Sequence, residues 1–357
     1  MRNGRLGVGL VGCGSQGPRY ARDLGLYDHL DLLGVADLDL ARAEHLAARH
    51  GVKAYRSLED MLQDDAIDIV VDVTSPHTHK EIVSRCLEAD KHVFNEKPLA
   101  LTYQDARDLV ELAEEHHRLL GSAPATYLGE AQQTAMKSIR DGRLGRVRVV
   151  YCEANWGRIE SWHPSPIPFY TVGPLFDVGL YPLTIVTAVL GPAARVSAFG
   201  KVVMPERATN RGVRFEVETP DFVVASIELA GGAVVRLSAN FYVGQHSKQK
   251  GLEFHGDEAS LYLESFHVFD CGVEYSRFDD AYRPLDLVAD PFEGTDWARG
   301  VADMGNAILE DRPHQAAGDH AAHVIEILCA ISQSARAAEA VDVTSSFVPP
   351  APLPWSG

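Results

Sequence analysis

The residues best placed to do chemistry begin with a glycine-rich turn near the N-terminus. The apolar run 6–11 leads into Gly12-Cys13-Gly14-Ser15-Gln16-Gly17, which has the G-x-G-x-x-G spacing. In such a turn the first glycine permits the tight bend and the second lets the backbone approach a pyrophosphate. The third lets the next helix pack close to the strand, with its N-terminal N–H groups facing the phosphates. The pattern therefore predicts dinucleotide contacts at Gly12, Gly14, Ser15, Gln16 and Gly17.

An acidic residue completes this pattern. A second apolar run, 30–36, ends at Asp37, which lies 20 residues after Gly17. A carboxylate at this offset can accept hydrogen bonds from both ribose hydroxyls and repels a 2′-phosphate. The sequence therefore predicts NAD as the cofactor in preference to NADP. The alternative is an ordinary strand-to-helix turn followed by a surface Asp.

Two further polar loops follow apolar runs that are predicted to be strands. One is Thr74-Ser75-Pro76-His77-Thr78-His79 after the run 67–73, and the other is Glu96-Lys97-Pro98 after the run 91–95. Ligands of doubly wound sheets bind outside the carboxyl ends of the strands, so both loops are predicted to face the cofactor. The cofactor candidates in these loops are Thr74, Ser75, Pro76, His79, Glu96 and Lys97.

Lys97 is the predicted catalytic residue. A partly desolvated lysine at a strand end can hold a substrate oxygen by its charge and help to set the pKa of a neighbouring group. The alternative is a solvated lysine in a surface loop before a helix.

Other chemically capable residues have weaker signals. Trp162 could stack on a sugar ring while His163 contacts a hydroxyl, or the two could belong to a loop aromatic cluster. His77 and His79 alternate in a loop, and His320 and His323 are one helical turn apart. Neither histidine pair has a third ligand nearby in the sequence, so no metal site is predicted.

The elements that position these residues alternate in type over the first third of the chain. Strand-like and helix-like segments follow one another up to about residue 122, which predicts a parallel, doubly wound sheet. A helix is expected to begin after Ser57, with this serine as its N-cap. The chain is thus expected to be α/β, with a Rossmann domain over residues 1–123.

The pattern changes after residue 124. Strand-like segments are expected at 146–155, 194–203, 221–229, 233–242, 251–255 and 259–263, with a hairpin at Gly231-Gly232. These segments predict a large, mostly antiparallel open sheet in a second α/β domain over residues 124–357. We expect one face of this sheet to be buried in a homo-dimer or homo-tetramer through Val234, Leu237 and Phe241.

The bulk composition narrows the class of protein. The chain has 357 residues, of which 46% are hydrophobic, and a formal net charge of −17. An acidic chain of this kind argues against nucleic acid or an anionic membrane as the main partner. Five scattered cysteines without a C-x-x-C motif favour a cytoplasmic location. The N-terminal apolar run is short and serves as the first strand rather than as a signal peptide, and no apolar stretch is expected to span a membrane.

Three motifs in order resemble the Gfo/Idh/MocA oxidoreductase family. They are the glycine turn at residues 12–17, Glu96-Lys97-Pro98, and Asp177-Val178-Gly179-Leu180-Tyr181. The resemblance covers nearly the whole chain. It implies a Rossmann domain followed by an α/β domain whose open sheet supports oligomers. It also implies that Lys97 is the catalytic lysine and that Pro98 follows a cis peptide bond.

One position departs from the family pattern. Many members have D-x-G-x-H-x-x-D, where the histidine exchanges a proton with the substrate hydroxyl, and this chain has Tyr181 there. Tyrosine at this position is similar to glucose–fructose oxidoreductase and to dihydrodiol or xylose dehydrogenases. A phenol can do the same task if a cation such as Lys97 lowers its pKa.

The resemblance implies an NAD-dependent dehydrogenase that acts on a secondary hydroxyl of a sugar, glycoside or cyclic polyol. Tyr181 would take the hydroxyl proton, Lys97 would polarise the oxygen, and Asp177 would fix the substrate or the lysine. The active site is then expected in the cleft between the two domains. Two alternatives remain: a redox-assisted glycosidase that recycles its cofactor, and a regulator that senses the dinucleotide without turnover.

Overall fold

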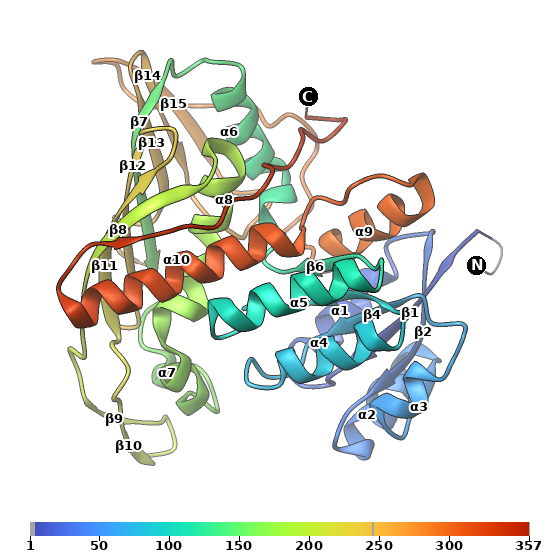
Figure 1. Cartoon of the computed structure of the whole chain (residues 1–357). Coiled ribbons are helices and arrows are strands. Elements are labelled where there is room, and N and C mark those ends of the chain that lie inside the picture. Colours follow the sequence, from blue (N-terminus) through green and yellow to red (C-terminus); the bar gives the residue numbers. More distant parts are fainter. Residues whose placement is uncertain (1–3, 245, 357) are drawn as a thin grey trace. The chain divides into compact units, whose positions relative to one another are not determined.

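The computed structural model describes residues 4–244 and 246–356, which form two compact units. Unit 1 contains residues 1–125 and 296–325, and unit 2 contains residues 126–295 and 326–357. The sequence predicts two continuous domains with a boundary after residue 123. In the structure the segment 296–325 belongs to the first unit. Figure 1 shows the helices and strands of the chain.

Unit 1 is built on a six-stranded parallel sheet with the order β3-β2-β1-β4-β5-β6. The strands are β1 (Leu6–Val11), β2 (Leu30–Ala36), β3 (Lys53–Tyr55), β4 (Ile69–Asp72), β5 (His92–Asn95) and β6 (Leu120–Ser122). The helices are α1 (Gly17–Leu24), α2 (Leu40–His50), α3 (Leu58–Leu62), α4 (His79–Glu88), α5 (Tyr103–Glu115) and α9 (Arg299–Glu310). The predicted doubly wound sheet is confirmed. Ser57 caps α3 as predicted, because its hydroxyl accepts a hydrogen bond from the backbone N–H of Asp60 at 3.2 Å.

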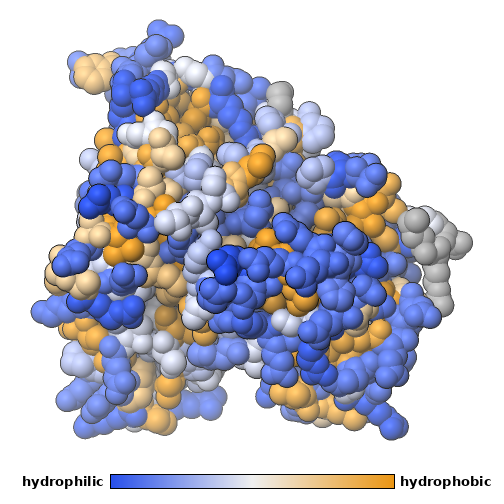
Figure 2. Space-filling view, in the orientation of Figure 1, coloured by the Kyte–Doolittle hydropathy of each residue, from blue (hydrophilic) through white to orange (hydrophobic). Residues whose placement is uncertain are grey.

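Helix α9 joins unit 1 because its apolar side chains complete that unit's core. Val301 and Met304 are fully buried in the same cluster as Leu10 and Phe94. The backbone N–H of Trp297, just before the helix, donates to the carboxylate of Asp23 at 2.9 Å. These contacts join segments more than 200 residues apart, which local sequence patterns do not register. On the outer side of this unit, α4 and α5 pack against each other (Figure 1), and the surface that they present in Figure 2 is mostly hydrophilic.

Unit 2 contains a nine-stranded sheet with the order β16-β15-β14-β13-β7-β12-β11-β8-β17. Its strands are β7 (Val147–Asn155), β8 (Ala193–Lys201), β11 (Phe222–Leu229), β12 (Val234–Asn240), β13 (Gly251–Gly256), β14 (Ala259–Leu263), β15 (Val273–Arg277), β16 (Arg283–Pro284) and β17 (Val341–Asp342). A separate hairpin is formed by β9 (Glu206–Ala208) and β10 (Arg214–Glu216). The sheet is antiparallel apart from the parallel pair β7 and β12, so the predicted mostly antiparallel sheet is confirmed.

Helical segments cover one face of this sheet. They are η1 (Thr126–Leu128), α6 (Glu130–Arg140), η2 (Ile159–Ser161), α7 (Ile167–Pro174), the π-turn η3 (Leu175–Gly179) and α8 (Leu180–Leu190), and the long α10 (Gly318–Ala337) begins in unit 1 and ends in unit 2. Helices α6 and α8 pack on the sheet and against each other, and Figure 1 shows both on the same side of it.

Two expectations need correction in unit 2. The 24-residue run Ile167–Leu190, which comprises α7, η3 and α8 and is kinked at Gly173, is long and apolar enough to span a membrane, although no such stretch was expected. In the structure 83% of the most apolar window is buried, as in the core helix of a globular unit. Leu237 and Phe241, which were assigned to an oligomer face, are fully buried within the chain, so only Val234, at 39% exposed, keeps that assignment.

Several buried histidines of unit 1 make its stability depend on pH. Burial, with His92 and Arg312 nearby, lowers the pKa of His314 to about 4. Burial, with His323 nearby, lowers the pKa of His320 to about 3. Both side chains are therefore neutral in the folded chain at pH 5, whereas an unfolded histidine is mostly protonated at that pH.

We expect stability to fall as the pH drops from about 6.5 towards the depressed folded pKa values. In this window the unfolded chain binds more protons than the folded chain. Each histidine then costs on the order of 2 kcal/mol by pH 5 relative to neutral pH. Urea unfolding at pH 7.5 and pH 5 measures the difference. His314→Gln should reduce the acid sensitivity, whereas His77→Gln, at an exposed position, should leave it unchanged. If the free energy of unfolding fell by the same amount between pH 7.5 and pH 5 in His314→Gln and in the parent, His314 would not be a source of the acid sensitivity.

Candidate functional site

Parallel pairing brings the predicted cofactor loops to one edge of the unit 1 sheet. Val11 at the end of β1 pairs with Ala36 at the end of β2 and with Asp72 at the end of β4. Asp72 pairs in turn with Asn95 at the end of β5. The glycine turn, Asp37, the Thr74 loop and Glu96-Lys97 each follow one of these strand ends, so the register places all four along the same edge.

The glycine turn has the backbone geometry that a dinucleotide requires. Gly12 has a positive φ of 99°, and a Cβ there would lie 2.8 Å from the carbonyl oxygen of Val73. A Cβ on Gly17 would lie 2.5 Å from the carbonyl oxygen of Gly12, so the start of α1 needs glycine for close packing. A Cβ on Gly14 would meet no atom within 4 Å, which leaves open space beside this backbone. These three environments match the three predicted roles, and the site fits a pyrophosphate.

Asp37 is held beside that turn by backbone donors. Its Oδ2 accepts a hydrogen bond from the N–H of Cys13 at 2.7 Å, and its Oδ1 accepts one from the N–H of Asp39 at 2.8 Å. The carboxylate is thereby oriented before any ligand binds. Arg42, the nearest basic residue in the sequence, pairs with Asp39 at 3.2 Å. The thiol of Cys13 is buried next to Asp37, and burial together with that negative charge raises its pKa to about 12.

His79 lies beneath the loops rather than on their surface. It is fully buried, with Nδ1 2.7 Å from the carbonyl oxygen of Pro98 and Nε2 3.3 Å from that of Thr74. The ring therefore joins the Thr74 loop to the Lys97-Pro98 loop. Thr74 is further fixed by a hydrogen bond from its backbone N–H to Asp72 at 2.9 Å. The predicted contact of His79 with the cofactor remains a prediction, and its visible role is to position both loops.

The backbone at Lys97 is held in place by a hydrogen bond to a neighbouring buried carboxylate. The buried carboxylate of Glu96 accepts a hydrogen bond from the Lys97 N–H at 2.9 Å and one from the hydroxyl of Tyr20 at 3.0 Å. The Lys97–Pro98 peptide bond is cis, as the family resemblance implied. The lysine side chain is half-buried. A cation at a strand end with this degree of burial can stabilise negative charge on a substrate oxygen.

In unit 2 the motif 177–181 spans the π-turn η3 and the first turn of α8. Asp177 and Tyr181 are both about 8% exposed and lie four residues apart, which places their side chains on one side of the helical segment. The burial of both polar side chains in a helix start fits a positioned site rather than a solvated surface.

The structure adds His267, which the sequence analysis did not single out. Its ring centroid lies 6.4 Å from that of Tyr181 and 5.3 Å from that of Trp156. Phe266 completes the cluster, 5.6 Å from Tyr181. Burial lowers the pKa of His267 to about 4, so the imidazole is neutral near pH 7. Its loop carries no recognisable motif, and only the folded sheet brings it beside Tyr181.

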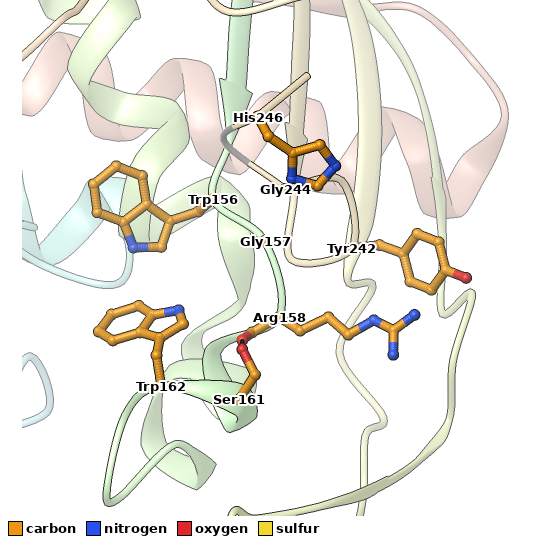
Figure 3. Close-up of a pocket in the computed structure, with 8 residues that line it drawn as sticks. All are labelled: Trp156, Gly157, Arg158, Ser161, Trp162, Tyr242, Gly244 and His246. Carbon is orange, nitrogen blue, oxygen red and sulfur yellow. Dashed lines mark hydrogen bonds between the residues drawn. The ribbon is translucent and has the colours of Figure 1, made fainter.

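Within the stretch 156–163, some side chains line a pocket and others pack against neighbouring residues. Trp162 is 52% exposed and lines a pocket of about 680 Å³ with Trp156, Arg158 and Tyr242 (Figure 3). His163 is turned to other contacts. Its Nδ1 accepts a hydrogen bond from the N–H of Ser165 at 3.0 Å, and its ring packs on Phe169 at 4.7 Å. The rings of Trp162 and His163 also contact each other edge to face, with centroids 5.5 Å apart, as in the alternative of a loop aromatic cluster. A joint role of the two residues in substrate binding stays a prediction.

A buried ionic cluster lies below this stretch. Arg207 is fully buried and bonds Glu160 at 2.8 Å, the hydroxyl of Tyr170 at 2.9 Å, and Asp221. The hydroxyl of Tyr170 donates to Glu160, and burial and this carboxylate raise its pKa, so it stays protonated. Glu160 is central to η2, so the cluster fastens the turn between Arg158 and Trp162. Across residues 4–244 and 246–356, no group of three His, Cys, Asp or Glu side chains is arranged to hold a metal ion.

Comparison with known protein families and sequences gives a consistent result. The model of an oxidoreductase family with an NAD-binding Rossmann fold matches residues 6–123, and the GFO/IDH/MocA C-terminal domain matches residues 132–262. Myo-inositol 2-dehydrogenase of Thermotoga maritima is 26% identical over 57% of this chain and 61% of its own length. Trans-1,2-dihydrobenzene-1,2-diol dehydrogenase of Sus scrofa is 29% identical over 56% of this chain and 57% of its own length. The match thus spans about three fifths of these relatives.

Solved structures share the fold at low sequence identity. A crystal structure of an NAD-binding oxidoreductase from Klebsiella pneumoniae has a TM-score of 0.83 and 23% identity, and covers 96% of this chain and 100% of that chain. Levoglucosan dehydrogenase in complex with NADH and levoglucosan has a TM-score of 0.84 and 22% identity over 96% and 100% of the two chains. At this identity the likeness establishes the architecture.

Proposed function

Because this chain belongs to the Gfo/Idh/MocA oxidoreductase family, we propose that it is an NAD-dependent dehydrogenase acting on a secondary hydroxyl of a sugar, glycoside or cyclic polyol. The observation that carries the proposal is the edge of the unit 1 sheet. There the open backbone at Gly14, the oriented carboxylate of Asp37 and the supported Lys97 follow aligned strand ends. The names of the relatives, an inositol dehydrogenase and a diol dehydrogenase, support a secondary alcohol as the reacting group.

The proposed mechanism gives each residue one task. Bound nicotinamide supplies the hydride acceptor. The turn from Gly12 to Gly17 holds the pyrophosphate, with the Thr74–Pro76 loop beside it, and Asp37 accepts from the ribose hydroxyls. Tyr181 takes the proton of the substrate hydroxyl, and Asp177 fixes the substrate. Lys97 stabilises the negative charge that develops on the substrate oxygen.

A substrate panel tests this function. Sugars, glycosides and inositols are mixed with the protein and NAD, and the absorbance of reduced nicotinamide is followed. We expect NADH to form with at least one class. Release of a sugar from a glycoside without net NADH would instead identify the redox-assisted glycosidase. Binding of NAD without turnover of any class would identify the regulator.

Cofactor choice is a separate prediction. Asp37 should make NAD bind at least tenfold more tightly than NADP, about 1.4 kcal/mol, through ribose hydrogen bonds and repulsion of the 2′-phosphate. Arg42 is engaged by Asp39, so it does not offset this repulsion fully. Calorimetry with both cofactors measures the ratio. Asp37→Ala should bring the ratio close to one, and Glu44→Gln, an exposed carboxyl on α2, should preserve it. Tighter binding of NADP by the parent protein would refute the assignment.

We also propose that the chain acts in the cytoplasm as a homo-dimer or homo-tetramer. All five cysteines lie in the described residues and none of them forms a disulfide, which suits a reducing compartment. Phe199 at 59% exposed and Val234 at 39% exposed stand on strands of the nine-stranded sheet, where association would remove them from water. Light scattering across micromolar concentrations tests the assembly, and a constant monomer mass would contradict it.

A further inference from the structure

We propose that the pocket bounded by Trp156, Trp162 and Arg158 binds the second unit of an acidic glycoside, a saccharide of at least two units that carries a carboxylate. The proposal rests on the proposed function for its reactive unit, which would lie at Tyr181. The pocket itself is argued from unit 2 alone.

Two strand ends build the pocket. Trp156 directly follows β7 and Tyr242 follows β12, and these strands are parallel neighbours that end together at the paired residues Asn155 and Asn240. The side-chain oxygen of Asn240 accepts hydrogen bonds from the N–H groups of Tyr242 at 3.2 Å and Val243 at 2.7 Å. The Trp156 N–H donates to the carbonyl of Asn240 at 3.0 Å. The walls are thus fixed by the sheet.

One end of the pocket is suited to a sugar ring. Figure 3 shows the indoles of Trp156 and Trp162 on the same side of the pocket, one above the other. Large, rigid aromatic faces bind the apolar C–H faces of sugar rings, and the 52% exposure of Trp162 leaves its surface available. The volume of about 680 Å³ falls in the range of pockets that hold drug-sized ligands, so it has room for more than one sugar ring.

The other end of the pocket is suited to an anion. Arg158 extends away from the tryptophans in Figure 3, and its guanidinium lies 5.0 Å from the ring centroid of Tyr242. In the part of the chain that the structure describes, Arg158 forms no ion pair, and the pocket lining contains no carboxylate. Arg158 is exposed, and on a chain with a formal charge of −17 a guanidinium braced on an aromatic ring in this way suits a carboxylate ligand.

The pocket adjoins the proposed reacting residue through shared neighbours. The ring of Trp156 lies 5.3 Å from His267, and His267 lies 6.4 Å from Tyr181. The His267 ring therefore contacts both the Trp156 wall of the pocket and Tyr181. A ligand that reaches both must be longer than a single sugar ring, which is why we assign a second unit rather than a monosaccharide.

Calorimetry tests the pocket without any turnover. The protein saturated with NADH is titrated with glucose, with cellobiose, maltose and lactose, and with the matching acids cellobionate, maltobionate and lactobionate. In at least one series we expect the acid to bind about tenfold more tightly than the neutral disaccharide, and the disaccharide more tightly than glucose. Arg158→Gln should reduce the acid to the affinity of its neutral partner, and Trp162→Ala should weaken both disaccharides about tenfold.

Matched variants control for general effects. Arg211→Gln and Trp355→Ala change an exposed arginine and an exposed tryptophan outside the pocket and should leave every affinity unchanged. Equal affinities of acid and neutral disaccharide in all three series, no binding in any, or no effect of either pocket variant would overturn the proposal. Tighter binding of glucose 6-phosphate than of every acid would also overturn it, because a single phosphorylated unit would then suffice. Binding without NADH formation from any substrate would overturn the proposed function and leave the pocket standing.

Discussion

Replacement of Lys97 by alanine is expected to lower kcat on the proposed sugar or polyol substrate by about 10²–10³. The substitution removes the cation that stabilises the developing alkoxide. The backbone of this loop should survive, because the hydrogen bond from the Lys97 N–H to Glu96 does not involve the substituted side chain. NAD affinity should change little, since Lys97 is not proposed to grip the phosphates. Lys201→Ala, an exposed lysine on β8, is the matched control.

Tyr181→Phe completes this prediction, because the two residues are proposed to act on the same oxygen. Loss of the proton acceptor should lower kcat by about 10²–10⁴ with little change in NAD affinity. The parent rate of alcohol oxidation should rise with pH, and Tyr181→Phe should flatten that rise. Tyr275→Phe removes a hydroxyl that donates to the carbonyl of Arg143 at 3.1 Å, outside the proposed site, and should keep the parent profile.

If Tyr181→Phe kept full activity, another residue would have to accept the proton of the substrate hydroxyl. The structure then favours His267, whose ring lies 6.4 Å from Tyr181 and is neutral near pH 7. His163, which the sequence suggests could contact a sugar hydroxyl, is less suitable because its Nδ1 accepts a hydrogen bond from the N–H of Ser165. A flattened pH profile in His267→Gln with Tyr181 intact would identify the histidine.

The cofactor half of the site could be predicted from sequence because its signals are local. Gly12 and Gly17 are required by backbone geometry, Gly14 leaves open space between them, and Asp37 follows at a fixed offset. Alternating apolar runs also predicted the six parallel strands. In each case the residues that determine the structure lie within a few tens of positions of one another.

The features that the sequence did not predict depend on contacts between residues that are distant in sequence. Helix α9 fills the core of unit 1 although it follows the strands by almost 180 residues, and His267 reaches Tyr181 from a loop without a motif. The segment 167–190 was not predicted as a helix. Its last part, α8, is apolar and almost entirely buried, so it lacks the one-sided periodicity that identifies a surface helix.

The second large effect is expected at Arg207, which the sequence analysis did not select. Arg207→Met should lower the free energy of unfolding by about 3–5 kcal/mol, because it leaves Glu160 and Asp221 buried without their cation. Urea unfolding followed by tryptophan fluorescence measures this loss. The control is Arg148→Met, which breaks a bidentate pair with Asp257 at the surface, where about half of each side chain is exposed. It should cost no more than about 1 kcal/mol.

Two further measurements separate lost charge pairing from lost packing. The triple variant Arg207→Met, Glu160→Gln, Asp221→Asn should recover much of the stability, since none of these three positions then carries a buried charge. The stability difference between Arg207→Met and the parent should also narrow as the pH falls. Burial without a cation raises the pKa of a carboxyl in the folded state, so its penalty is present above that pKa and disappears when the group is protonated. A difference that is independent of pH and unchanged in the triple variant would assign the effect to packing. Glu160 lies in the turn between Arg158 and Trp162, and its ion pair with Arg207 holds that turn in place. Arg207→Met should therefore also weaken disaccharide binding.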